Sequence, residues 1–266
     1  MTLDEYIKNP MGKDNAVLNA TTRELIRAQY SAKFDNILLR ENGKIEYYLY
    51  THSKKNTYWV HAKIPSETVK NFYYDVIFKF YTTEKVSSGG SNLFEYNVRF
   101  FSNDPAFVFT HAHVFRENDL FIEELRSKMS KEALKKSPTT TNPHNNLGYV
   151  KTIYFAYLLM KNKKLNNLTR FKAESRELDP KLLLSEVMEA DEKIALRLEE
   201  GSKVSKRKTV VIDKNLARKI SSQGGDLSNS RFKVGTTKTV GTIKNKVKTT
   251  SKVKRKWIIY CICNMI

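Results

Sequence analysis

Residues 93–115 read LFEYNVRFFSNDPAFVFTHAHVF, and the rest of the chain is organised around this apolar, aromatic stretch. Its middle, Ser102-Asn103-Asp104-Pro105, supplies turn-forming residues, and the flanking Phe and Val residues favour β-strands. After the turn, alternate residues fall on opposite faces of a strand, and neither face carries a fixed charge. The pattern predicts a hairpin whose second strand, 106–115, is central in a sheet because both of its faces are covered.

Further strands are predicted before this hairpin, where β-rich runs alternate with turn residues. Residues 36–40 and 44–51 flank Glu41-Asn42-Gly43, and Asn-Gly between such runs is the strongest short hairpin signal. Residues 58–64 and 72–82 complete the set, and the second of these runs alternates well between two faces.

Helical patterns surround these strands and dominate after residue 115. A helix is predicted from Thr21 or Thr22 to about Asp35. Later helices are predicted from Asp119 toward Pro138, with a restart at Ser130 as an alternative, from Asn146 onward, and from Asp179-Pro180 to Gly201. Strands first and helices after favour an α+β fold, with a largely antiparallel sheet packed against C-terminal helices, over a doubly wound parallel sheet.

Charge and aromatic content divide the 266 residues into parts of different character. The net charge is +19, yet from Gly201 onward 17 Lys and Arg face only two Asp, which leaves +15 there and +4 for the first 200 residues. Low hydrophobicity with high net charge is typical of disordered segments. We therefore predict an N-terminal arm over 1–20, an α+β globular domain over 21–200 and a flexible basic tail over 201–266.

The basic clusters of this tail are the most specific functional signal. Dense lysines bind phosphate backbones by counterion release without reading sequence, and scarce aromatics argue against single-strand stacking. The alternatives are a solvated tail that aids solubility and a tail held by an acidic protein. The residues predicted to bind nucleic acid are Lys203, Lys206, Arg207, Lys208, Lys244, Lys246, Lys248, Lys252, Lys254, Arg255 and Lys256.

The last ten residues, Trp257–Ile266, are apolar and directly follow a basic cluster. They fit a short segment that docks on a neighbouring subunit, a surface anchor on anionic lipid, or a prenylation box at Cys263 that lacks the usual aliphatic pair. Docking is the interpretation we prefer. Cys261 and Cys263 lie too close together in sequence to cross-link the fold, which indicates a reducing compartment.

No secretion signal is predicted, because the first residues are acidic where a signal peptide needs basic and apolar ones. No apolar run approaches the ~20 residues needed to cross a bilayer, so no membrane span is expected.

The histidines are candidate metal ligands. On the predicted strand His111 and His113 share a face, which is the spacing of a strand-borne metal site, and His52, His61 or His144 offers a third ligand. The neighbouring phenylalanines favour the simpler interpretation, two hydrogen-bonded histidines in or beside a core.

Other catalytic signatures are missing from the sequence. It contains no Gly-x-Ser-x-Gly and no P-loop. Asp75, Glu95 and Asp104 would form a nuclease-like metal cluster only if the fold brought them together. We therefore predict a non-enzymatic protein without metal or cofactor.

Three segments resemble uncharacterised proteins of tailed bacteriophages with AT-rich genomes: Tyr96–Phe115 (YNVRFFSNDPAFVFTHAHVF), Phe121–Lys136 and Leu147–Lys161 (LGYVKTIYFAYLLMK). The abundance of Lys, Asn, Ile and Tyr fits such a source. The resemblance spans residues 1–160, implies a phage virion structural component and transfers no site residue.

Together these patterns predict a non-enzymatic phage structural or assembly protein, located in the virion or host cytoplasm. Its body is expected to pack against copies of itself or other virion proteins, while its cationic tail contacts nucleic acid or an acidic partner. The alternative is a sequence-nonspecific DNA- or RNA-binding protein that acts inside the infected cell.

Overall fold

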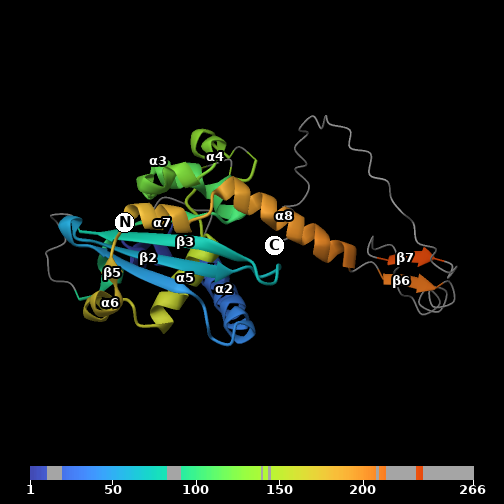
Figure 1. Ribbon diagram of the computed structural model, residues 1–266, viewed down its shortest axis with the longest axis horizontal. Coiled ribbons are helices and arrows are strands. Elements are labelled where there is room, and N and C mark those ends of the chain that lie inside the picture. The colour runs from blue at the N-terminus through green and yellow to red at the C-terminus, as the bar shows by residue number, and fades with distance from the viewer. Residues whose placement is uncertain are drawn as a thin grey trace. The chain divides into compact units, whose positions relative to one another are not determined.

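The computed structural model describes residues 1–10, 20–82, 91–138, 140–142, 145–207, 210–213 and 232–235. The chain forms two compact units, Met1–Arg207 and Lys208–Ile266. The first unit is an α+β domain in which a five-stranded, mostly antiparallel sheet packs against helices, as predicted (Figure 1).

The sheet has the strand order β4-β3-β2-β1-β5. Its first four strands pair antiparallel, and the two-residue strand β5 joins β1 in parallel. The predicted strands 44–51, 58–64 and 72–82 correspond to β1, β2 and β3. The strands are β1 (Tyr47–His52), β2 (Thr57–Pro65), β3 (Tyr73–Tyr81), β4 (Asn97–Ser102) and β5 (Arg176–Glu177).

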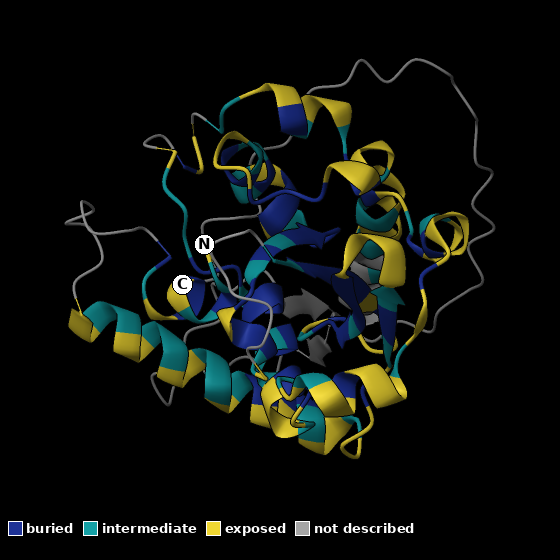
Figure 2. Ribbon diagram, turned by 90° about the vertical axis from the view of Figure 1, so that its left-hand side faces the viewer, coloured by how far each residue is buried: buried dark blue, intermediate teal, exposed yellow. Residues whose placement is uncertain are grey.

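One face of the sheet carries most of the large apolar side chains. Phe78, Phe80 and Phe100 are at most 1% exposed, and each such burial contributes about 1.5–3 kcal/mol. In Figure 2 the central strands β2 and β3 are mostly dark blue, whereas the outer faces of the surrounding helices are exposed. The helices on this face are α1 (Leu3–Lys8), α2 (Ala20–Arg40), α5 (Lys151–Asn162) and α6 (Leu168–Glu174).

Helix α1 belongs to the core, although residues 1–20 were predicted to be an arm. Leu3 and Tyr6 are fully buried, and the Tyr6 ring lies 4.9 Å from the ring of Phe100. The Tyr6 hydroxyl also donates a 2.8 Å hydrogen bond to the Gly148 carbonyl. An amphipathic helix of six residues is not stable alone, so it gains its stability from this packing.

The predicted strand 36–40 is wrong, because these residues are the last turns of α2. Asn42 and Gly43 have φ of 52° and 71°, and the Gly43 amide donates to the Leu38 carbonyl at 2.7 Å. Asn-Gly therefore ends a helix here and does not turn a hairpin. Both structures need left-handed backbone conformations, which is why the dipeptide signal fits either.

The predicted second strand at 106–115 is also wrong. Residues Phe107–His111 form a π-helix, η3, and Ala112–Glu117 continue as α3. Asp104 begins the helical segment: its carboxylate accepts from the Ala106 amide at 3.2 Å, and its carbonyl accepts from the Val108 amide at 2.9 Å. An apolar run without charged positions suits a buried helix as well as a buried strand, so its alternation did not distinguish them.

Because residues 106–115 are helical, β4 lies at one edge of the sheet. Its outer side is covered by a short extended segment: the Phe100 amide donates to the Leu120 carbonyl at 2.7 Å, and the Ile122 amide donates to the Phe100 carbonyl at 3.2 Å. These bonds satisfy backbone groups that an open edge would leave unpaired. In place of the helix predicted from Asp119 there are two short pieces, η4 (Glu123–Lys128) and α4 (Lys131–Lys135).

The opposite face of the sheet is covered by residues 178–197 and by η4. Helix α7 (Pro180–Glu186) begins as predicted, with the Asp179 carboxylate accepting from the Lys181 and Leu182 amides at 2.9 and 3.3 Å. The single helix predicted to reach Gly201 is broken after Glu186, and α8 (Ala190–Arg207) continues past Gly201.

The second unit contains a two-stranded parallel pair, β6 (Val210–Asp213) and β7 (Phe232–Gly235). The apolar segment Trp257–Ile266 lies outside the described residues. Within the described part of the chain, no helix is long and apolar enough to cross a membrane.

Candidate functional site

The basic residues predicted to bind nucleic acid fall into two groups. Positions 203, 206 and 207 lie in the last two turns of α8, three and four residues apart, a spacing that groups positions on one side of a helix. The remaining predicted residues lie outside the described residues: Lys208, Lys244, Lys246, Lys248, Lys252, Lys254, Arg255 and Lys256.

The first half of α8 is held against the sheet, and this attachment positions its basic end. Ala190 is fully buried, the Lys193 ammonium lies 4.8 Å from the centre of the Phe72 ring, and the Arg197 guanidinium lies 6.0 Å from that of Tyr74. Leu198 is 69% exposed, and the far end of α8 extends beyond the sheet (Figure 1).

A buried polar cluster lies beneath the junction of α7 and α8. His61 of β2 bonds through Nε2 to the Asp75 carboxylate of β3 at 2.9 Å, and both residues are at most 5% exposed. Asn103, which follows β4, donates to the same carboxylate at 2.7 Å and accepts from the Asp75 amide at 2.8 Å. Three segments distant in sequence are thus joined by one carboxylate.

This cluster also holds the break between the two helices. The Asn103 side chain donates to the Met188 carbonyl at 3.2 Å, and Nδ1 of His61 lies 4.0 Å from the Glu186 carboxylate. That carboxylate accepts a 2.9 Å hydrogen bond from the Tyr50 hydroxyl. The end of α7 and the start of α8 are therefore fixed to β1, β2 and β3 by polar contacts.

The electrostatics of the cluster favour an ionised Asp75. Burial acts to raise the pKa of Asp75, but the hydrogen bond and charge of His61, the charge of Lys193 and the Asn103 amide outweigh it, and the net pKa is lowered. Burial lowers the pKa of Lys193, and the Asp75 charge opposes part of that effect. For Tyr50, burial and the Glu186 carboxylate both raise the pKa.

A His–Asp pair is also the arrangement that activates a nucleophile, provided that the second ring nitrogen reaches one. Here Nδ1 of His61 is buried, makes no hydrogen bond and faces the Glu186 carboxylate. A carboxylate has no proton for the histidine to remove, so it is not a nucleophile of this kind. The geometry supports a positioning role for the cluster. This cluster is not predicted from the sequence, although a polar residue within each of the apolar runs YWVHAKI and YYDVIF is the signal that could have indicated it.

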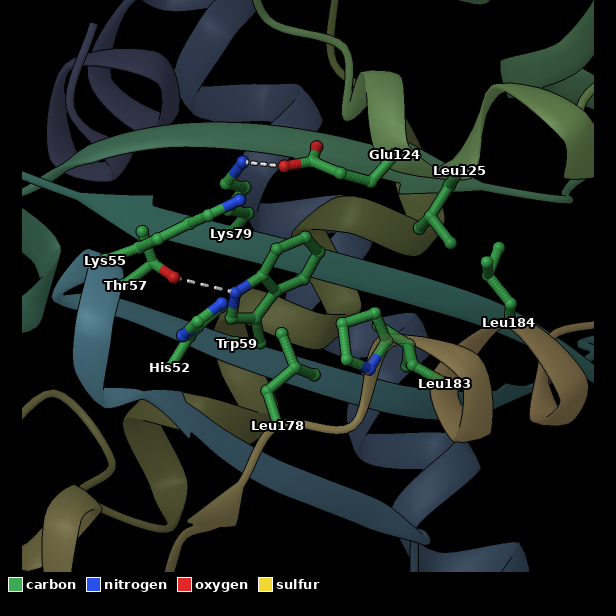
Figure 3. Close-up of a pocket in the computed structure, with 11 residues that line it drawn as sticks. His52, Lys55, Thr57, Trp59, Lys79, Glu124, Leu125, Leu178, Leu183 and Leu184 are labelled. Carbon is green, nitrogen blue, oxygen red and sulfur yellow. Dashed lines mark hydrogen bonds and ion pairs between the residues drawn. The ribbon is translucent and has the colours of Figure 1, made fainter.

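A small pocket opens on the same face of the sheet, between β2, β3, η4 and α7 (Figure 3). Lys79 forms an ion pair with Glu124, and its ammonium lies 5.1 Å from the centre of the Trp59 ring. The Trp59 indole donates to the Thr57 hydroxyl at 3.0 Å and is only 3% exposed. These four polar groups are therefore occupied with one another. His52 and Lys55 also line the pocket, and the rest of the wall is formed by apolar side chains, among them Leu125, Leu178 and Leu183.

The histidine pair considered as a metal site is not arranged as predicted. His111 and His113 lie on helical backbone, where residues two apart point in different directions. His113 contacts the Leu134 carbonyl at 3.2 Å, whereas the His111 ring packs near Phe115, and burial lowers the pKa of His111 to about 4. Among the described residues no group of three His, Cys, Asp or Glu side chains could hold a metal ion.

The three acidic residues considered for a nuclease-like cluster likewise have separate partners. Asp75 bonds to His61 and Asn103. Glu95 accepts from the Asn92 side-chain amide at 3.1 Å, and Asp104 accepts from the Thr152 hydroxyl at 3.0 Å.

No known protein family, curated protein or solved structure matches this chain.

Proposed function

We propose that this chain is a non-enzymatic phage structural or assembly protein whose C-terminal unit binds nucleic acid through its basic residues. One observation carries the proposal, the uneven distribution of charge. Lys208–Ile266 contain 14 Lys and Arg against two Asp, a net of +12, whereas the much longer Met1–Arg207 unit has a net of +7.

Lysine density of this kind suits a phosphate backbone. Each phosphate that a Lys or Arg neutralises releases condensed counterions, so binding is strong at low salt and needs no base contacts. Within 244–256 seven basic residues occur in thirteen positions, with no acidic residue among them. The folded body supplies the packing surface for an assembly, and the basic unit supplies the attachment to the nucleic acid.

The test is a binding titration with a 20-base-pair DNA duplex and the full-length chain at 50 and 200 mM salt. In the charge-removal variant Lys244, Lys246, Lys248, Lys252, Lys254, Arg255 and Lys256 become Gln. With six or more phosphate contacts the wild type should lose about 10³–10⁵ in affinity over this range, and the variant much less. A matched variant in which the six lysines become Arg should bind like wild type.

The proposal is contradicted if the Gln variant keeps the affinity and salt dependence of the wild type. The assembly part has its own measurement, which is the mass distribution by light scattering and the appearance by electron microscopy. A defined ring or lattice supports a structural role. A monomer that binds duplex DNA supports instead a nucleic-acid-binding protein that acts in the infected cell.

A further inference from the structure

The pocket between β2, β3, η4 and α7 has a polar end and an apolar end (Figure 3). The polar end lies where β1 passes into β2 through the short turn η1 (Ser53–Lys55). The apolar end is formed by leucines of η4 and α7, which lie on the other side of the Trp59 ring in Figure 3. A molecule that fits this pocket therefore needs one polar and one apolar part.

The polar end carries an excess of positive charge. Lys79 is 9% exposed, and its ammonium is paired with the Glu124 carboxylate. Lys55 also lines the pocket, but it is exposed and forms no ion pair with a described residue. Two lysines and one carboxylate thus line the pocket, so one positive charge is left for a ligand to neutralise.

His52 adds a second group with unused bonding capacity to the polar end. Its Nδ1 atom is buried, makes no hydrogen bond and lies 3.9 Å from the Glu177 carboxylate. Glu177 does not line the pocket, and it accepts hydrogen bonds from the Ser53 amide and hydroxyl at 3.1 and 2.6 Å. Buried polar atoms rarely lack a partner, so the free nitrogen of His52 is a feature that a functional site explains.

The apolar end limits the size of the ligand. Leu125 and Leu183 are 1% and 3% exposed, and Leu184 is half-buried. The volume of the cavity is about 60 Å³. An apolar cavity of about 150 Å³ holds benzene, and about 10–15 Å³ is enough for one water molecule, so this pocket suits an apolar group of only a few carbons.

We infer that this pocket binds a small organic acid that has a single carboxylate and a short, branched aliphatic chain. The carboxylate lies at Lys55 and Lys79, where its one negative charge matches the one positive charge in excess, and the chain packs on the leucines. A phosphate group carries up to about two charges and no apolar part, so it fits both ends less well. The inference does not depend on the proposed nucleic-acid binding, because none of these residues lies in the C-terminal unit.

The experiment uses 4-methylpentanoate as the probe and the full-length chain with Trp257 replaced by Phe. Trp59 is then the single tryptophan, and its indole N–H gives one resonance in the ¹⁵N NMR spectrum. Because the Trp59 ring lines the pocket, this resonance should shift as acid is added and should saturate with a Kd of about 1 mM, since so small a ligand makes few contacts. The amide of the same acid has the same shape without the charge, and it should bind at least about tenfold more weakly.

Two pairs of variants locate the site. Lys55→Gln removes the excess charge and should weaken binding of the acid about tenfold, whereas Lys54→Gln changes the neighbouring lysine of the same turn, which does not line the pocket. Leu184→Asn makes the apolar end polar and should weaken binding about fivefold. Its control is Leu182→Asn, also on α7, because Leu182 is 49% exposed and does not line the pocket. Both controls should bind the acid like the parent chain.

The inference is overturned if the Trp59 resonance shows no saturable shift at about 20 mM acid, or if the amide binds as tightly as the acid. It is also overturned if Lys54→Gln weakens binding as much as Lys55→Gln, because the acid is then attracted by basic residues in general. An equal response to inorganic phosphate would show that the apolar end contributes nothing. Thermal unfolding of each variant verifies that the fold is intact.

Discussion

Replacing Asn103 with Ala tests the buried cluster that fixes the junction of α7 and α8. The Asn103 side chain is fully buried and makes three contacts, two with Asp75 and one with the Met188 carbonyl. Alanine can make none of them, and it leaves the Asp75 amide, the Asp75 carboxylate and the Met188 carbonyl with fewer partners.

The expected loss of stability follows from the kinds of bond removed. The bond to the ionised Asp75 is charge-assisted and is worth about 1.5–3 kcal/mol, and the two neutral bonds are worth about 0.5–1.5 kcal/mol each. We therefore expect Asn103→Ala to lower the free energy of unfolding by about 2.5–6 kcal/mol, a large part of the stability of a typical domain. Loss of the Asn103 bond should also raise the pKa of Asp75.

Urea unfolding followed by circular dichroism measures this free energy, with Asn162→Ala at the exposed end of α5 as the control. Hydrogen exchange reports the local effect, because amides of residues 187–194 should lose protection more than those of β2. A decrease below about 1 kcal/mol, the size of an ordinary surface change, would refute the structural role of the cluster.

Two further predictions concern pH. The pKa of His111 is lowered to about 4 in the folded chain, so between pH 7 and pH 5 the imidazole becomes protonated in the unfolded chain but stays neutral in the folded one. The free energy of unfolding should therefore fall by about 2 kcal/mol from pH 7 to pH 5. In urea titrations at pH 7 and pH 5, His111→Gln should lose less stability between the two pH values than the wild type does. Equal losses of stability in the wild type and the variant would contradict the prediction. Burial raises the pKa of Asp104, so its contribution to stability is lost as pH rises through the folded-state pKa. Asp104→Asn should therefore gain stability relative to wild type between pH 4.5 and pH 7. A difference in stability that does not change with pH would show that burial does not raise the pKa of Asp104.

The errors in the predicted fold have a common cause in local ambiguity. Residues 106–115 alternate well enough for a strand, yet every position is compatible with burial, and the bonds from Asp104 to the amides of Ala106 and Val108 direct the chain into a helix. Asn42-Gly43 shows the same ambiguity in a turn, because left-handed conformations end helices as readily as they close hairpins. In both places the neighbouring residues permit two structures, and packing selects one.

The candidate sites divide in the same way. The basic clusters near the C-terminus are visible in sequence, since charge density is a local property. The His61–Asp75–Asn103 cluster is not, because it depends on the register of the strands that bring these three residues together.

By itself the sequence determined the α+β class, the three strands β1 to β3, the start of α7 at Asp179 and the separation of a near-neutral body from a basic C-terminal unit. These features depend on residues close together in the chain, such as alternating side chains, a capping carboxylate and runs of lysine. Tertiary structure alone decided that β4 is an edge strand, that residues 107–117 are helical and that Asn103 reaches Met188. Those outcomes depend on which distant surfaces bury one another, and the free energy of that burial outweighs the weak local preference for a strand.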